Sequence, residues 1–258
     1  MNYLERDSTM KKAIIAASLA AVLCTSAQAD TLLGLYIGGQ VWANQAKGSL
    51  GKEEMNQTTF DFDNETSGSY FVALEHPIPL IPNAKVVSTK YDTVGNTTID
   101  VSTTVEGVTS TESVLAKATF DASYVDYTLY YEILDNDLLT LDLGLTARDL
   151  DIDSQITAAG NTSDLSASKV LPLLYANAII GLPFTGFNVF AQADFLSRSD
   201  YDIYDYQVGV SYEVLDNLAV DLELTLGYRA VKLELNDLDG LYSDMTFKGV
   251  FAGAIVHF

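Results

Sequence analysis

The chain has 258 residues, of which 48% are hydrophobic, and a formal charge of −21 from 35 acidic and 14 basic residues. This length suits one large domain or two small ones. The acidic surplus disfavours nucleic-acid partners, because few basic groups could neutralise phosphates, and 15 Tyr and 11 Phe argue against a disordered chain.

The N-terminal segment has the pattern of a secretory signal peptide. Two lysines precede an apolar run over residues 13–23, and a small-x-small motif for signal peptidase follows. We therefore predict a mis-start over 1–9, a signal peptide over 10–29 and export through the general secretory pathway. The predicted cleavage site consists of Ala27, Ala29 and Asp30, with the cut before the aspartate. A membrane anchor is the alternative, but the apolar run is short for one.

Apolar and polar residues alternate from residue 31 to the end of the chain. In 33–43, for example, Leu35, Ile37 and Val41 alternate with residues such as Tyr36 and Gln40. The pattern recurs at 125–133, 139–148, 208–214 and 220–229. A period of two predicts strands. It fits either a soluble sandwich or a membrane barrel with apolar residues toward lipid and polar residues toward the lumen.

The lengths of the strands and of their connections favour the barrel. Strands of about ten residues suit a tilted membrane span. Tight connections are predicted at 76–83, 134–138, 183–186 and 215–218, and long polar loops at 45–67, 92–118, 150–168, 197–205 and 234–243. Periplasmic turns are short and outer loops long in outer-membrane barrels. We therefore predict an all-β, transmembrane, antiparallel up-and-down barrel of about ten strands over 30–258, with eight or twelve as alternatives.

The C-terminus resembles the assembly signal of outer-membrane proteins, which the barrel-assembly machinery reads. The residues of this pattern are Val250, Ala252, Ala254, Val256 and Phe258. A chance terminal phenylalanine is the alternative. Together with the export signal, the pattern predicts the outer membrane of a Gram-negative cell, with membrane lipid and lipopolysaccharide as partners.

One hairpin sequence occurs twice. Residues 131–136 recur as 212–217, and the match continues without a gap from Arg148 to Arg229, at an offset of 81. Either duplication of a hairpin or convergent use of a favourable turn sequence explains the repeat. Both copies carry acids and an arginine on the polar face, so we predict carboxylate–guanidinium pairs inside the barrel. The predicted polar interior residues are Glu75, Asp126, Glu132, Asp142, Arg148, Glu213, Glu223 and Arg229.

Aromatic and acidic residues complete the picture of a membrane barrel. Interfacial aromatic girdles, with ordinary strand propensity as the alternative, are predicted from Tyr36, Trp42, Tyr70, Tyr127, Tyr131, Tyr206, Tyr212 and Tyr228. The acids over 61–65, 149–153, 200–205 and 237–239 fit solvated loops, since none matches a twelve-residue calcium loop.

The sequence offers no recognisable catalytic group. The two histidines, His76 and His257, stand beside no pattern of acid and nucleophile, and Cys24 lies inside the signal peptide. We therefore predict no catalytic residue, no metal site, no cofactor and no enzymatic activity.

The proline-rich turn provides a family resemblance. The run Glu75–Asn83, EHPIPLIPN, resembles the first periplasmic turn of a Gram-negative outer-membrane barrel family of the GlyGly-associated outer membrane protein type, and 171–177 and 182–186 look similar to that family too. The resemblance implies an outer-membrane barrel, and it implies no activity, substrate or catalytic residue.

These observations favour a small outer-membrane barrel with a structural or surface-interaction role and a lumen largely filled by polar side chains. A narrow, cation-preferring diffusion channel is the alternative, because an acidic interior would select cations. An outer-membrane hydrolase is third, since spatial groupings of residues are not visible in a sequence. The sequence does not predict the oligomeric state.

Overall fold

The computed structural model describes residues 33–258 apart from 55–56, 106–107, 137, 216 and 218–219, so the predicted mis-start, signal peptide and cleavage site lie outside it. In this part of the chain, ten antiparallel strands form one closed barrel in which each pairs with its sequence neighbours and β1 pairs with β10. The strands are β1 (Gly34–Gly51), β2 (Thr58–Glu75), β3 (Asn83–Val105), β4 (Val108–Asn136), β5 (Leu139–Ala158), β6 (Asn161–Leu182), β7 (Phe187–Ser197), β8 (Tyr201–Leu215), β9 (Asp221–Leu238) and β10 (Leu241–His257). The predicted ten-strand, up-and-down barrel is confirmed. No helix among the described residues is long and apolar enough to cross a membrane.

The two ends of the barrel are referred to here as the base and the top. The base holds the start of β1 and the end of β10, where Leu35 and Phe258 exchange two backbone hydrogen bonds of 3.3 and 3.0 Å. The top holds the opposite ends of the strands. The four connections predicted as tight all lie at the base, between β2 and β3, β4 and β5, β6 and β7, and β8 and β9.

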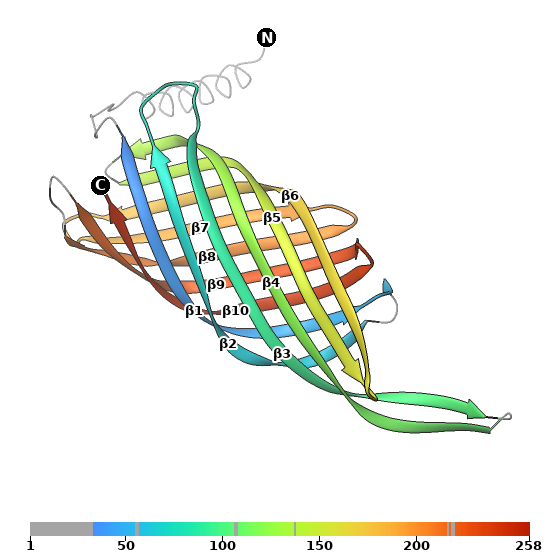
Figure 1. The fold of residues 1–258 in the computed structure, drawn as a ribbon. Helices are drawn as coiled ribbons and strands as arrows, with labels where there is room; N and C mark the ends of the chain where they lie inside the picture. The colour runs from blue at the N-terminus through green and yellow to red at the C-terminus, as the bar shows by residue number, and fades with distance from the viewer. Residues whose placement is uncertain (1–32, 55–56, 106–107, 137, 216, 218–219) are drawn as a thin grey trace, which may run out of the picture.

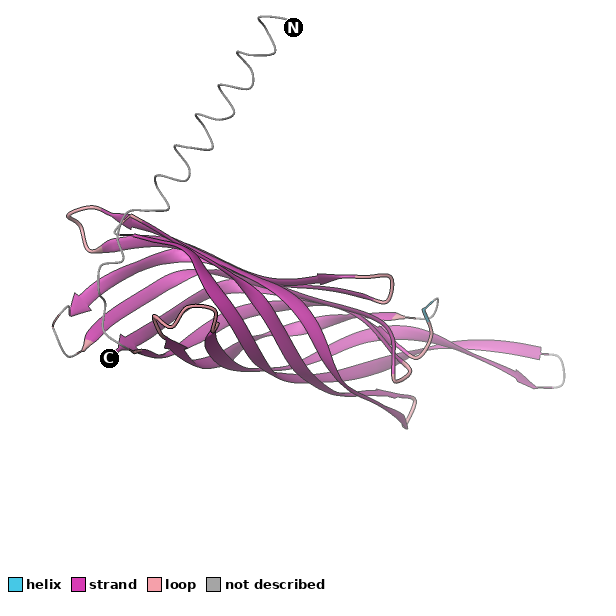
Figure 2. Ribbon diagram, turned by 90° about the horizontal axis from the view of Figure 1, so that it is seen from above, coloured by secondary structure: helices cyan, strands magenta, loops and turns pink. Residues whose placement is uncertain are grey.

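The prediction of long polar loops at the top was wrong. Strands continue through most of those segments, and the connections there span only 52–57, 106–107, 159–160, 198–200 and 239–240. Beyond residues 96 and 116, β3 and β4 are paired only with each other among the described residues, so 97–115 forms a projecting ribbon. This ribbon extends past the other hairpins in both views (Figures 1 and 2).

The loops were mispredicted because the strands reverse their polarity partway along. Near the base, β5 exposes Leu143 and Leu145 and turns polar residues inward. Beyond Arg148 it buries Leu150 and Ile152 completely and exposes the aspartates at 149, 151 and 153. The apolar residues therefore change from odd to even positions. The acidic segment 149–153 therefore remains part of a strand and is not a loop.

The reversal produces a hydrophobic core inside the top of the barrel, the top core. Its side chains fill the lumen as in a small soluble barrel. The largest members that are less than 2% exposed include Trp42, Tyr91, Phe120, Phe247, Leu50, Leu150, Ile152, Ile203, Leu233 and Leu235. Across this core β6 contacts β9 and β10, which are not its neighbours in the sheet. The lumen filling at the top is therefore apolar, contrary to the predicted polar filling.

The repeated hairpin has the same construction in both copies. The β4–β5 pair shifts register between Glu132 and Leu134, and the β8–β9 pair shifts between the corresponding Glu213 and Leu215. A side-chain oxygen of Asn136 accepts the Leu139 backbone N–H at 3.1 Å, as that of Asn217 accepts the Val220 N–H at 3.2 Å. A shared bulge and a shared Asx turn support one plan used twice.

The β5–β6 turn offers a test of local strain. Ala159 and Gly160 form a two-residue turn in which both φ angles are positive, 51° and 76°, a conformation that favours Asn-Gly. Because Ala159 is exposed and a non-glycine residue is costly there, we expect Ala159→Asn to raise the free energy of unfolding by about 0.5–1 kcal/mol. Urea unfolding of the refolded barrel in detergent measures this. Ala159→Val should lower stability, and an unchanged value for both variants would contradict the strained turn.

Candidate functional site

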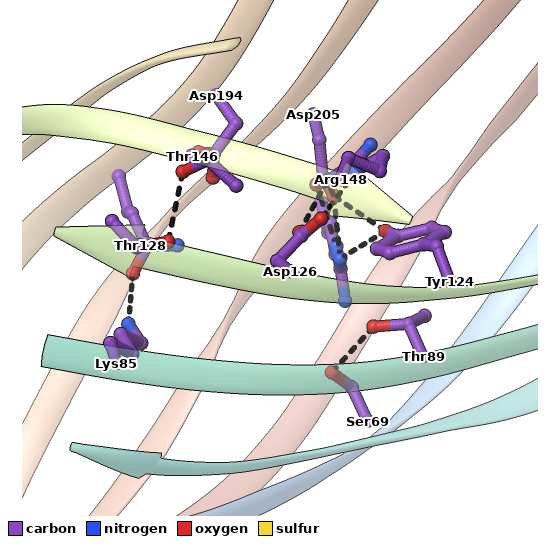
Figure 3. A network of polar contacts seen from close by, with 12 residues as sticks. Ser69, Lys85, Thr89, Tyr124, Asp126, Thr128, Thr146, Arg148, Asp194 and Asp205 are labelled. Atoms are coloured by element: carbon purple, nitrogen blue, oxygen red, sulfur yellow. Dashed lines mark hydrogen bonds and ion pairs between the residues drawn. The ribbon is translucent and has the colours of Figure 1, made fainter. Parts of the chain in front are cut away.

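A layer of charged side chains crosses the lumen directly below the top core. The Arg148 guanidinium donates from Nε to Asp126 Oδ1 at 2.8 Å and from Nη2 to Asp126 Oδ2 at 2.7 Å. Its Nη2 also reaches Asp205 Oδ2 at 3.1 Å. Figure 3 shows these groups converging from different strands. Because the side chains are almost fully buried, their charges are compensated by one another and not by water.

Asp205 is the centre of this charged layer. Arg229 donates to its two oxygens, at 2.9 Å from Nε and 2.7 Å from Nη2. The Tyr124 hydroxyl donates to Asp205 Oδ2 at 2.7 Å, and Tyr91 shares a 2.7 Å hydrogen bond with Tyr124. The carboxylate of Asp205 therefore links both arginines, whereas Asp126 binds only Arg148.

The two arginines occupy equivalent positions of the repeat, and Asp205 binds both of them. Arg148 and Arg229 are separated by 81 residues, and so are Tyr124 and Asp205, which meet across the lumen. The cross-strand neighbour of Arg148 is Asp126, but Arg229 has the neutral Gln207 in that position. The second copy of the hairpin therefore lacks one acid, and Arg229 depends on Asp205 for its carboxylate.

Below the charged layer lies a polar chamber of about 330 Å³. It extends from Asp205 and Arg229 to residues at the ends of strands, among them Tyr36, Glu75 and Asp135. Of its acids near the base, Glu132 and Asp135 are exposed, so the chamber opens at that end. Toward the top it ends at the charged layer and the top core.

Three hydrogen bonds inside the lumen connect strands that are not neighbours in the sheet. The Tyr130 hydroxyl donates to Glu75 Oε1 at 2.7 Å. Thr146 donates to Asp194 Oδ1 at 2.6 Å, and both side chains are labelled in Figure 3. Asn188 donates to Glu223 Oε1 at 3.1 Å. Each bond joins strands that are distant in sequence, so the chamber exists only in the closed barrel.

The predicted polar interior residues fall into two groups. Asp126, Arg148 and Arg229 lie in the charged layer. Of the others, Glu75, Glu132, Asp142 and Glu223 line the chamber, and Glu213 lines a second pocket that shares Glu223 with it. The arginines thus take their acid partners from Asp126 and Asp205. The acids of the repeat, at 132, 142, 213 and 223, are not among those partners.

Three predicted placements were wrong: those of Asp205, of Trp42 and of Tyr36, which was predicted for the interfacial girdle but lines the chamber. Asp205 was assigned to an outer acidic loop, but β8 begins at Tyr201 and buries Asp205 in the lumen. Trp42, assigned to an interfacial girdle, is 1% exposed and belongs to the top core. Trp42 stands at an even position of β1, and the even positions of this strand point inward, so the alternation alone predicts its inward orientation. The exterior tyrosines of the predicted girdle are Tyr70, Tyr127, Tyr131, Tyr206, Tyr212 and Tyr228.

Sequence reasoning missed Lys85, Asp194 and Tyr124 as lumen residues. Lys85 and Tyr124 stand at inward positions of alternating strands. The alternation could therefore have predicted that these two side chains point into the lumen, but it could not have predicted which residues they contact.

The remaining candidates lie at or near the base. His257 stacks on Tyr36 with ring centroids 4.1 Å apart, and its Nδ1 lies 3.3 Å from Asp221 Oδ2. His76 lies in the β2–β3 turn, where its Nδ1 accepts the backbone N–H of Ile78 at 3.3 Å. The predicted assembly-signal residues Val250, Ala252, Ala254 and Val256 occupy β10, and Phe258 follows it, 52% exposed.

These features define a closed β-barrel with an apolar exterior near its base and a polar chamber inside. No protein-family model and no curated protein matches the chain, so the resemblance to the GlyGly-associated type stays a prediction.

Solved structures with a similar course of the chain include three outer-membrane or surface proteins. The outer membrane protease OmpT from Escherichia coli has a TM-score of 0.49 at 9% identity, covering 90% of this chain and 99% of its own. Neisserial surface protein A has a TM-score of 0.33 at 13% identity, covering 87% and 97%. Ail, the attachment invasion locus protein of Yersinia pestis, has a TM-score of 0.35 at 10% identity, covering 88% and 100%. The protease and attachment roles in these names belong to those proteins, and the similarity concerns the fold alone.

Proposed function

We propose that this chain is a small outer-membrane β-barrel with a closed lumen and a surface-interaction role at its top. The observation that carries the proposal is the reversal of polarity along the strands. On β5 the exterior is apolar from Leu139 to Ala147 and acidic at Asp149, Asp151 and Asp153. A tilted strand needs roughly 9–11 residues to cross a bilayer, so the apolar part supports one membrane crossing.

The apolar exterior near the base forms a band that continues on other strands. On β9, Leu224, Leu226 and Tyr228 are exposed, and the exterior then changes to Lys232 and Glu234, which form an ion pair with each other. Exposed apolar surface all around a barrel is costly in water, and lipid removes that cost. The exterior tyrosines fit the interfacial girdles of such barrels.

The surface role rests on what lies beyond the band. The top stands outside the proposed membrane with an acidic exterior, and the ribbon over 97–115 projects furthest from it (Figure 1). The top core buries the apolar side chains of this part inside the lumen, so we expect the top to stay folded without contact with lipid. We propose lipopolysaccharide as the immediate neighbour of the top, and the barrel-assembly machinery as the reader of the C-terminal pattern.

The closed lumen distinguishes this proposal from the diffusion channel. Trp42, Tyr91 and Phe247 pack together across the lumen, with ring centroids 5.6 and 5.0 Å from Tyr91, and the charged layer lies directly below. In planar bilayers we expect the refolded mature protein to show no steady conductance, because the described side chains of these two layers fill the lumen. Stable, cation-selective openings would contradict the closed lumen and favour the channel.

Two cysteine variants on β1 test the same point chemically. The mature chain has no native cysteine if the signal peptide is removed, because Cys24 is the only one. Gln40 lines the chamber and Ala46 lies in the top core. We expect Gln40→Cys to react with a water-soluble maleimide in the folded barrel and Ala46→Cys to remain unlabelled. Equal labelling of both would show a water-filled lumen.

A further inference from the structure

The chamber carries more negative charge than its own residues compensate. Among the described residues, six acidic and two basic side chains line it, a formal surplus of four negative charges. Asp205 and Arg229 bind each other, so the surplus lies on the acids nearer the base: Glu75, Glu132, Asp135, Asp142 and Glu223. A cavity of about 330 Å³ is within the range of small-molecule sites.

One of these acids is buried with only one of its two carboxylate oxygens hydrogen-bonded. Asp142 is 4% exposed, and its Oδ2 accepts a 2.9 Å hydrogen bond from Asn177. Its Oδ1 has no hydrogen-bond partner among the described residues, and neither has Oε1 of Gln207, which lines the same chamber. Leaving a buried acceptor unpaired is costly. Both atoms are acceptors, so the missing component of the site is a donor.

Lys85 shows what kind of donor the walls accommodate. Its Nζ donates to Gln192 Oε1 at 2.8 Å and lies 4.8 Å from the centre of the Phe71 ring and 5.7 Å from that of Tyr175. The aromatic faces and the amide oxygen together hold one ammonium group. The chamber walls also include Tyr130, Phe190 and Phe251. A ligand with ammonium groups on an apolar chain would meet the same surroundings.

The acids are too widely distributed for a metal ion. Glu75 comes from β2, Asp142 from β5 and Glu223 from β9, and the described residues contain no group of three or more acidic, histidine or cysteine side chains able to hold a metal. Negative charge spread over separate walls fits a ligand with several positive centres at separate points.

We propose that the chamber is a binding site for an aliphatic polyamine, which enters from the base with one ammonium group on Asp142 and another near Glu75 or Glu223. Asp142 supplies the buried anchor, and the aromatic walls pack on the methylene chain. The site goes beyond the proposed function, since binding in detergent micelles does not depend on which membrane holds the barrel or on whether ions pass through it.

Equilibrium dialysis of radiolabelled spermidine against the refolded barrel in detergent tests the site. At 0.15 M NaCl we expect saturable binding of one spermidine per barrel. Asp142→Asn keeps the acceptor for Asn177 and removes the charge, so it should weaken binding about tenfold or more, the effect of one hydrogen bond to a charged group. Asp151→Asn is the matched control, because Asp151 is an exposed acid on the outside of the same strand.

Heat-modifiable gel migration identifies the variants that fold. If Asp142→Asn does not fold, Glu223→Gln replaces it, with weaker binding again expected. Three outcomes overturn the proposal: no saturable binding at this salt concentration, equal loss in Asp142→Asn and Asp151→Asn, or complete displacement of spermidine by an equal concentration of Mg²⁺. The last would mean that a simple cation site, and not a polyamine site, lies in the chamber.

Discussion

Replacing Asp205 with alanine should lower the free energy of unfolding by about 3–5 kcal/mol, the usual cost of removing one partner from a buried ion pair. Asp205 is the acid shared by Arg148 and Arg229, and its side chain is 7% exposed. Arg148 keeps its two bonds to Asp126 in this variant. Arg229 keeps the Tyr124 hydroxyl at 3.0 Å and the Trp42 ring at 5.2 Å, but its buried guanidinium loses its counter-charge.

Urea unfolding of the refolded barrel in detergent measures this loss. Asp202→Ala is the matched control, because Asp202 lies on the same strand and pairs with Lys232 at 3.5 Å, but its side chain is 43% exposed. Such a pair contributes about 0–1 kcal/mol. Adding Arg229→Met to Asp205→Ala should recover part of the loss by removing the unpaired charge. Similar losses for Asp205→Ala and Asp202→Ala would contradict the central role of Asp205.

Replacing Phe247 with alanine should cost about 3–5 kcal/mol of unfolding free energy, as large-to-small changes of buried aromatic residues do. Phe247 is 1% exposed. Its ring stacks on Tyr91 at a centroid distance of 5.0 Å and lies 5.9 Å from Phe120. Because these rings fill the lumen at the top, the change leaves a cavity that the strands cannot close without losing their register.

The same unfolding measurement distinguishes this from an effect of side-chain size alone. Phe195 on β7 is 46% exposed on the exterior, so Phe195→Ala creates no internal cavity and should cost much less. A loss for Phe247→Ala no greater than that for Phe195→Ala would mean that the top core does not support the barrel.

The sequence by itself determined the strands and their outward face near the base. Alternation such as that of Leu143 and Leu145 is a property of the extended backbone, in which successive side chains point to opposite sides. Alternation predicted the strands, the lengths of the strands and connections predicted the closed barrel and the base turns, and a repeated sequence predicted the repeated hairpin. The alternation also contained the change from odd to even apolar positions at Arg148, although polar composition made that segment look like a loop.

Only the tertiary structure decided what each inward residue contacts. The shear and tilt of a closed barrel set which strands face each other across the lumen, and no local pattern encodes them. This is why Asp205, and not an acid of the repeat, binds both arginines, and why Asp142 is left with an unpaired oxygen in a chamber. The alternation determined which way each side chain points, and closure of the barrel determined its partner.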